Sequence, residues 1–198
     1  MDPLIDADEE GATPLTPEER DGLNPTYITL RRELNEVEQI GIADADLWAF
    51  SRKRDVLNEA FLRGLHKRMF KNVWKWAGNY RKTPRNIGIE AWRIEHDIRQ
   101  LLDDVRYWQE NETYSRIEIA VRFHHRLVFI HPFPNGNGRF SRLAADLLLV
   151  SMAHPRLGWG RGNLTSTSEL RQAYISALRA ADQHNLQPLI EFATSQTI

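Results

Sequence analysis

The segment from Arg139 to Ala153 places apolar residues around nearly the whole circumference of a helix, at Leu143, Ala144, Leu147, Leu148, Leu149 and Val150. A helix that is apolar on all sides has to be enclosed by other elements, because such a surface cannot face water. Apolar residues also recur at helical spacing in further segments, namely 27–40, 44–50, 55–70, 94–108, 115–129, 168–178 and from 188 onward. Ser115, with Glu118 three residues later, is typical of a helix N-cap. We therefore expect an all-α fold of about eight helices around a central helix at 139–153.

The chain contains no cysteine, so disulfide scaffolds, thiolate metal sites and cysteine nucleophiles are excluded. Its 198 residues, with 41% hydrophobic and 27% charged side chains, have the length and composition of one globular domain. The longest apolar runs, such as 147–150, are far too short to cross a bilayer, and the N-terminus lacks the basic region of a secretory signal. We expect a cytoplasmic protein without a membrane partner.

Charge divides the chain into two unequal parts. Residues 1–26 hold eight acidic residues, one basic residue and four of the nine prolines, and they predict a flexible acidic tail. Residues 27–198 hold 25 basic and 19 acidic residues, a net charge of +6, and are expected to form a single domain. This mild basicity suits a phosphate-bearing ligand but is too weak to indicate nucleic acid.

Helical spacing stops after Trp76. Residues 79–89 show no helical period, and Pro84 and Gly88 disfavour a helix there. This stretch predicts a short β-hairpin or an extended loop.

The loop 131–138 lies between two helical segments and contains two prolines and two glycines. Gly136 and Gly138 can adopt positive φ and leave their backbone N–H groups uncovered. These groups lie at the N-terminus of the next helix, where the helix dipole also favours anions. Asn137 can add an amide donor. The loop therefore predicts an anion site.

Three side chains define the anion more closely. Arg139 and Arg142 are three residues apart and share the first turn of the following helix. Two guanidinium groups beside backbone amides suit a polyphosphate better than a single carboxylate. His131 lies at the other lip of the loop, where a neutral imidazole can act as a general base toward a hydroxyl. We interpret the loop as a nucleotide-polyphosphate site with a histidine base.

From His131 to Arg142 the sequence reads H-P-F-P-N-G-N-G-R-F-S-R, which resembles the signature H-P-F-x-[D/E]-G-N-G-R-x-x-R of Fic-domain proteins. Other matching segments are Trp76-Ala77-Gly78 with Arg81, Asn86-Ile87-Gly88, and Tyr174 to Phe192. The resemblance covers about residues 45–193, and the chain is similar to the compact bacterial type called mobile mystery protein B. It implies the Fic fold, in which a small β-hairpin flap accompanies the helices.

The resemblance also implies a reaction, the transfer of AMP from ATP to a hydroxyl side chain of a target protein, with Mg²⁺. His131 would deprotonate the hydroxyl, and Phe133 would anchor the loop in the core. The phosphates would be held by the amides of Gly136 and Gly138, by Asn137 at the α-phosphate, and by Arg139 and Arg142 at the β- and γ-phosphates. An extended target segment would pair with the flap, which comprises Thr83, Pro84, Arg85, Asn86, Ile87 and Gly88.

Asn135 stands where the family mostly has an acidic Mg²⁺ ligand. An amide oxygen can bind Mg²⁺ but carries no charge, so weaker metal binding is expected. This departure keeps two alternatives open: a Fic-type phosphotransferase, or a nucleotide-binding toxin–antitoxin module without AMP transfer that acts with an antitoxin-like partner.

Fic proteins are often restrained by a helix with the pattern [S/T]-x-x-x-E-[G/N], and Thr29 to Glu33 matches its first half. By this resemblance Glu33 would pair with Arg142 and block the γ-phosphate site. Leu34 departs from the pattern, so a solvated surface charge at Glu33 is an equal alternative.

His124 and His125 precede the loop, but no acidic residue lies nearby at a ligand spacing. We therefore expect one buried, hydrogen-bonded histidine and one exposed histidine rather than a metal site.

Overall fold

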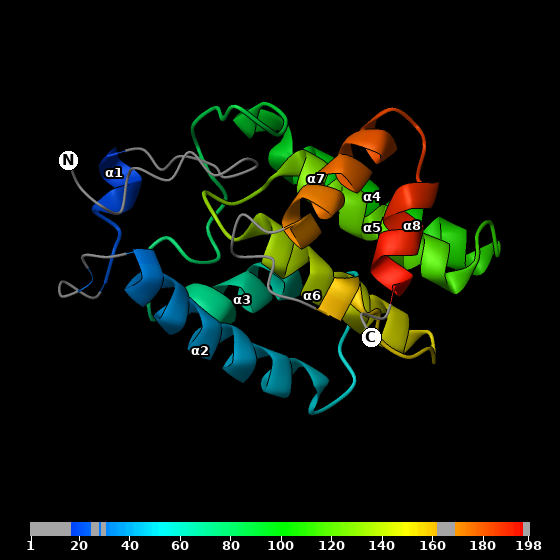
Figure 1. Ribbon diagram of the computed structural model, residues 1–198, viewed down its shortest axis with the longest axis horizontal. Helices are drawn as coiled ribbons and strands as arrows, with labels where there is room; N and C mark the ends of the chain where they lie inside the picture. The colour runs from blue at the N-terminus through cyan, green and yellow to red at the C-terminus, as the bar shows by residue number, and fades with distance from the viewer. Residues whose placement is uncertain (1–16, 25–27, 29–30, 162–168, 196–198) are drawn as a thin grey trace.

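Helix α6 (Asn137–Ser151) lies in the middle of the structure, and other helices cover it (Figure 1). The computed structural model describes residues 17–24, 28, 31–161 and 169–195. Helix α6 packs most extensively along α5 (Arg116–Ile130) and also contacts α2 (Arg31–Phe50) and α3 (Glu59–Phe70). The predicted central helix and the all-α fold are confirmed for these residues.

The remaining elements enclose this centre. They are α1 (Pro17–Arg20), η1 (Ala91–Arg93), α4 (Ile94–Glu110), η2 (Trp159–Arg161), α7 (Glu169–Asp182) and α8 (Gln187–Thr194). Helix α4 packs on α5, while α7 and α8 pack together and against α5. Among the helices of the described ranges, none combines the length and the hydropathy that a membrane-spanning helix needs.

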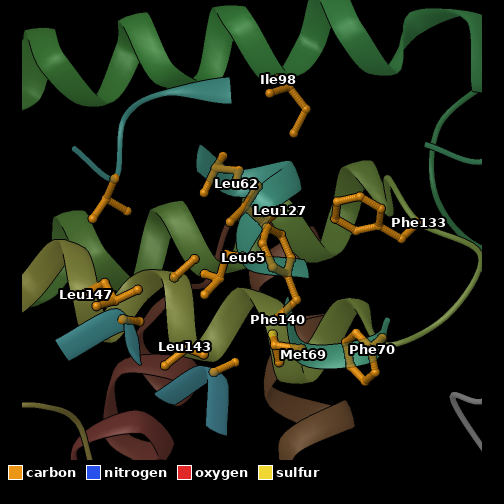
Figure 2. Close-up of a cluster of buried hydrophobic side chains, with 14 of the residues drawn as sticks. Leu62, Leu65, Met69, Phe70, Ile98, Leu127, Phe133, Phe140, Leu143 and Leu147 are labelled. Atoms are coloured by element: carbon orange, nitrogen blue, oxygen red, sulfur yellow. The ribbon is translucent and has the colours of Figure 1, made fainter. Parts of the chain in front are cut away.

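Helix α6 contributes to two hydrophobic clusters, which explains its apolar circumference. Its residues Leu143 and Leu147 join the larger cluster, together with Leu65 of α3 and Leu127 of α5 (Figure 2). On another face, Ala145 and Leu149 join a second cluster formed with α7 and α8. Burial of these side chains stabilises the fold by about 1.5–3 kcal/mol for each large aliphatic side chain.

Helix α2 is continuous from Arg31 to Phe50, where two separate helices at 27–40 and 44–50 were expected. Gly41 lies where α2 crosses α3. A Cβ atom there would lie 2.3 Å from the carbonyl oxygen of Met69, so the close crossing of the two helices requires glycine. The glycine thus serves helix packing rather than a helix end.

The predicted N-cap of α5 is confirmed. The Ser115 hydroxyl accepts a hydrogen bond from the backbone N–H of Glu118 at 3.2 Å. The Glu118 carboxylate pairs with Arg122 one turn later, at 2.7 Å. These contacts define the first residue of α5, and the loop 131–136 follows at the other end of this helix.

Part of the segment expected to be a tail is held against the domain. Leu23 forms an isolated antiparallel bridge with Trp74, beside bonds from Asn24 N to Val73 O at 2.7 Å and from Lys75 N to Gly22 O at 2.8 Å. The rest of the predicted tail, residues 1–16, 25 and 26, lies outside the described residues.

In place of the expected β-hairpin, residues 82–89 form an irregular loop. Pro84 has no N–H to donate to a ladder. The carbonyls of Thr83 and Ile89, at the two ends of the loop, accept hydrogen bonds from the Arg81 guanidinium. Arg81 therefore joins these two ends, as a strand ladder would in a hairpin.

Candidate active site

The loop between α5 and α6 begins and ends with left-handed backbone. His131 ends α5 with φ 53°, and its N–H bonds to Leu127 O at 3.1 Å. Gly136 precedes α6 with φ 78°. A Cβ atom at Gly136 would lie 2.6 Å from ring carbons of Phe70, so both the backbone angle and the packing require glycine. The turn into α6 is therefore packed tightly against α3.

Side chains of the loop hold it together from inside. Asn137 accepts a hydrogen bond from Phe133 N at 2.9 Å and donates to Phe133 O at 2.8 Å. Phe133 is fully buried and lies edge-on to Phe140, with ring centroids 5.1 Å apart, so its predicted role as anchor is confirmed. The Asn137 side chain, expected to donate to a bound phosphate, is thus engaged within the loop.

His66 of α3 supports the loop from below, a role that the sequence did not indicate. Its ring stacks on Phe133 with centroids 3.7 Å apart. Its Nδ1 accepts from Gly78 N at 3.0 Å, and its Nε2 lies 3.0 Å from the carbonyl of Asn135, which leaves Nε2 as the donor. Burial lowers the pKa of His66 to about 3, so the ring is neutral at neutral pH.

Asn135, whose carbonyl accepts from His66, also uses its side chain within the loop. Its Oδ1, the predicted Mg²⁺ ligand, accepts a hydrogen bond from Gly136 N at 2.5 Å. A cation there would have to share this oxygen with the backbone. Within the described ranges, no group of three or more histidine, aspartate or glutamate side chains is arranged to hold a metal ion.

A cavity of about 420 Å³ opens above the loop. It brings together most of the predicted site, namely His131, Gly136, Asn137, Gly138, Arg139, Arg142 and the flap residues Ile87 and Gly88. Glu33, Asn135 and the flap residues Thr83, Pro84, Arg85 and Asn86 are not among its lining residues. Gly88 lies directly against His131, because a Cβ atom at Gly88 would be 2.6 Å from the Cβ of His131.

Helices α5 and α7 form the opposite wall, which the motif did not predict. Apolar residues of this wall are Val128, Phe129, Ile175 and Leu178, and charged or polar ones are His125, Arg171, Arg179 and Asp182. His125 Nε2 lies 2.8 Å from Asp182 Oδ1. His125 therefore lines the cavity and is largely covered, contrary to the expected exposed histidine. The spacing of Ile175 and Leu178, three residues apart, could have predicted that they share one face of α7, which here faces the cavity.

Arg139 forms an ion pair with Glu38 of α2, at 2.7 Å. Glu38 is 3% exposed, and its other oxygen accepts from Trp74 Nε1 at 2.9 Å. Sequence reasoning missed Glu38, although it lies in the buried stripe of α2 between Leu34 and Ala45. A carboxylate in such a stripe needs a charged or hydrogen-bonding partner. Glu33 lies in the first turn of α2, and its pairing with Arg142 stays a prediction.

Arg142 is held by a different network. Its guanidinium hydrogen-bonds the Tyr174 hydroxyl, which lies 3.1 Å from Nε2 of the fully buried His124. Burial and the Arg142 charge lower the pKa of His124 well below its usual value, so the ring is neutral. The Tyr174 oxygen accepts from Arg142, and its hydroxyl shares a hydrogen bond with the neutral ring of His124. The expected buried, hydrogen-bonded histidine is thus confirmed at His124.

His131 is 7% exposed, and burial is the main cause that lowers its pKa to about 4. The positive charges of Arg81 and Arg85 lower it further, while the carbonyl of Val128 acts in the opposite direction. At neutral pH the imidazole is therefore unprotonated and able to accept a proton from a hydroxyl placed in the cavity.

Comparison with known proteins finds a family model whose match includes the loop 131–138. The Fic/DOC family model matches residues 56–149. Protein adenylyltransferase fic-1 of Caenorhabditis elegans is 27% identical over 174 residues, which cover 84% of this chain and 32% of that protein. The chain thus spans about a third of the length of this curated relative.

Two solved structures show the same fold. The N-terminal Fic domain of a VirB-translocated Bep effector from Bartonella quintana superposes with TM-score 0.68 at 19% identity, covering 89% of this chain and 91% of that one. BepC from Bartonella tribocorum, with bound AMPPNP, gives TM-score 0.65 at 20% identity, covering 92% and 100%. The family model, the fold and the loop from His131 to Arg142 together identify this chain as a member of the Fic/DOC family.

Proposed function

We propose that the protein is an adenylyltransferase that transfers AMP from ATP to a hydroxyl side chain of a target protein. The observation that carries the proposal is a neutral, buried histidine in one cavity with the amides and arginines at the start of α6. Related proteins named protein adenylyltransferase and a fold neighbour with bound AMPPNP support it. We further propose residues 27–198 as the Fic domain.

Each part of the cavity suits one part of ATP. The amide of Gly138 and the guanidinium groups of Arg139 and Arg142 suit the triphosphate, whereas the N–H of Gly136, also expected to hold phosphate, donates to Asn135 Oδ1. The apolar side chains of α5 and α7 suit a nucleobase.

In the transfer, the target hydroxyl oxygen bonds to the α-phosphorus, and the bond from that phosphorus to the oxygen bridging to the β-phosphate breaks. The hydroxyl proton moves to the ring of His131, and pyrophosphate leaves with its charge stabilised by the arginines.

Mg²⁺ would arrive with the triphosphate, in a shell made mainly of phosphate oxygens and water. Asn135 Oδ1 does not line the cavity and already accepts from Gly136 N, so it would join that shell only by sharing or giving up this bond. The ion would supply positive charge beside the leaving pyrophosphate. The chain itself orients the triphosphate at the start of α6 and keeps His131 unprotonated.

The test is incubation with α-³²P-ATP and candidate target proteins, followed by mass spectrometry of labelled proteins. Wild type should add AMP, and His131→Ala should lose about 10²–10⁴-fold in rate while ATP binding stays near normal. His96→Ala, at a side chain that is 78% exposed on α4, is the matched control and should keep wild-type activity.

Three results would contradict the proposal. Retained transfer in His131→Ala would remove the base from the mechanism. A mass gain of phosphate would instead identify a phosphotransferase, and ATP binding without turnover would identify a nucleotide-binding module.

A further inference from the structure

Arg81 is a buried arginine at the point where the chain enters the flap. It is 2% exposed. Its backbone N–H bonds to Pro132 O at 2.9 Å, so the main chain at Arg81 already lies against the loop that carries His131. The guanidinium then reaches both this loop and the flap.

The contacts of the guanidinium go to backbone carbonyls on two elements. On the α5 side, Nε donates to His131 O at 2.7 Å and Nη2 to Ile130 O at 3.3 Å. On the flap side, Nη1 donates to Thr83 O at 2.9 Å and Nη2 also donates to Ile89 O. One planar group with five fixed donors can satisfy such a set, whereas a lysine ammonium offers three donors from a single point.

The carbonyls of Ile130 and His131 lie at the C-terminal end of α5, where the helix leaves carbonyls without helical partners and the dipole favours a cation. Arg81 satisfies both needs at once. It thereby holds His131 in its left-handed conformation, with φ 53°.

The same cation holds the flap over the base. Thr83 begins the flap and Ile89 directly follows it, and Gly88 at the end of the flap packs on His131. A Cβ atom at Gly88 would lie 2.9 Å from Nη2 of Arg81 and 2.6 Å from the Cβ of His131. Gly88 of the flap therefore packs against both the Arg81 guanidinium and His131.

We propose that Arg81 is a positioning residue that fixes the flap relative to His131, so that a target segment bound on the flap delivers its hydroxyl to the imidazole. The inference rests on the proposed function, because it concerns how that function brings hydroxyl and base together. Arg81 does not line the nucleotide cavity, so its effect is on the target side of the reaction and not on ATP binding.

The experiment compares Arg81→Met, Arg81→Lys and the control Arg63→Met. Arg63 is a fair match because it also donates to a backbone carbonyl of this segment, Gly78 O at 3.0 Å, and its guanidinium lies 5.1 Å from the ring centre of Tyr80. Its contacts are with neither His131 nor the flap.

Two readouts follow from the geometry. Hydrogen exchange of the peptide 82–90 should accelerate about tenfold or more in Arg81→Met, since two bonds at the flap ends are lost. With the target found by the labelling experiment, kcat should fall about 10²-fold while KM for ATP stays within twofold, because misplacement of reacting groups affects the chemical step. Arg81→Lys should recover part of both effects, and Arg63→Met should show neither.

Arg81→Lys keeps the test decisive if Arg81→Met does not fold, because a folded lysine variant still lacks the planar guanidinium and its five donors. Flap exchange and kcat equal to those of Arg63→Met would overturn the proposal, as would a rise in KM for ATP that accounts for the whole loss. If wild type transfers no AMP, the proposed function fails. Flap exchange would then still decide whether Arg81 fixes the flap.

Discussion

Replacing His66 by leucine tests how much His66 stabilises the loop between α5 and α6. The substitution leaves the N–H of Gly78 and the carbonyl of Asn135 without their partner, at about 1–3 kcal/mol each. Loss of the stacked contact with Phe133 adds about 0.5–1.5 kcal/mol. We expect the free energy of unfolding to fall by roughly 2.5–7.5 kcal/mol, which lowers Tm by roughly 5–30 °C in a domain of this size.

The size of this loss should depend on pH, because wild-type His66 is neutral in the folded protein. Its pKa is about 3 when folded and near 6.5 when unfolded, so the unfolded state binds the proton first as pH falls. The stability that the neutral ring contributes is full above pH 6.5 and is lost toward pH 3, at about 1.4 kcal/mol per pH unit. His124 and His131, also buried with lowered pKa, add the same slope. Near pH 5 the three together give about 4 kcal/mol per pH unit.

The assay is urea unfolding of wild type and His66→Leu at pH 7.5, 6.5 and 5.5, followed by tryptophan fluorescence and circular dichroism. The difference between the two proteins should shrink by about 1.4 kcal/mol from pH 7.5 to 5.5, with about 1 kcal/mol of this below pH 6.5, since the variant lacks one titrating group. His96→Leu, at an exposed position, should change stability by less than about 0.5 kcal/mol. A difference for His66→Leu below about 1 kcal/mol, or one that does not change with pH, would refute the reasoning.

Three further substitutions test individual site residues. Asn135→Asp should lower the Mg²⁺ concentration for half-maximal transfer by adding a charged oxygen, and an unchanged requirement would place Asn135 outside the metal shell. Glu33→Gln should raise the rate of AMP transfer if Glu33 restrains Arg142, and an unchanged rate would make Glu33 a surface charge. Glu38→Gln removes the charge that opposes Arg139 and should lower the free energy of unfolding by about 1–3 kcal/mol. Thermal unfolding should show that ATP restores part of this loss, and a loss independent of ATP would argue against a phosphate role for Arg139.

The sequence alone was sufficient where one contiguous segment holds all the information. The apolar circumference of α6 predicted its central place, and Ser115 predicted the start of α5. The loop from His131 to Arg142 was readable because its glycines, arginines and histidine are separated by a few residues. Helix geometry then brings them to one helix end without reference to the rest of the fold.

Contacts between distant parts of the chain were decided only by the tertiary structure. Glu38 reaches Arg139 across 101 residues, and His66 reaches Asn135 across 69. The pattern in α2 pointed to Glu33 and gave no sign of Glu38, because a local motif cannot say which further turns of that helix lie against α6. Likewise, the composition of residues 79–89 allowed a hairpin or a loop. Only the tertiary structure shows a loop, with the Arg81 guanidinium donating to carbonyls at both of its ends and to the end of α5.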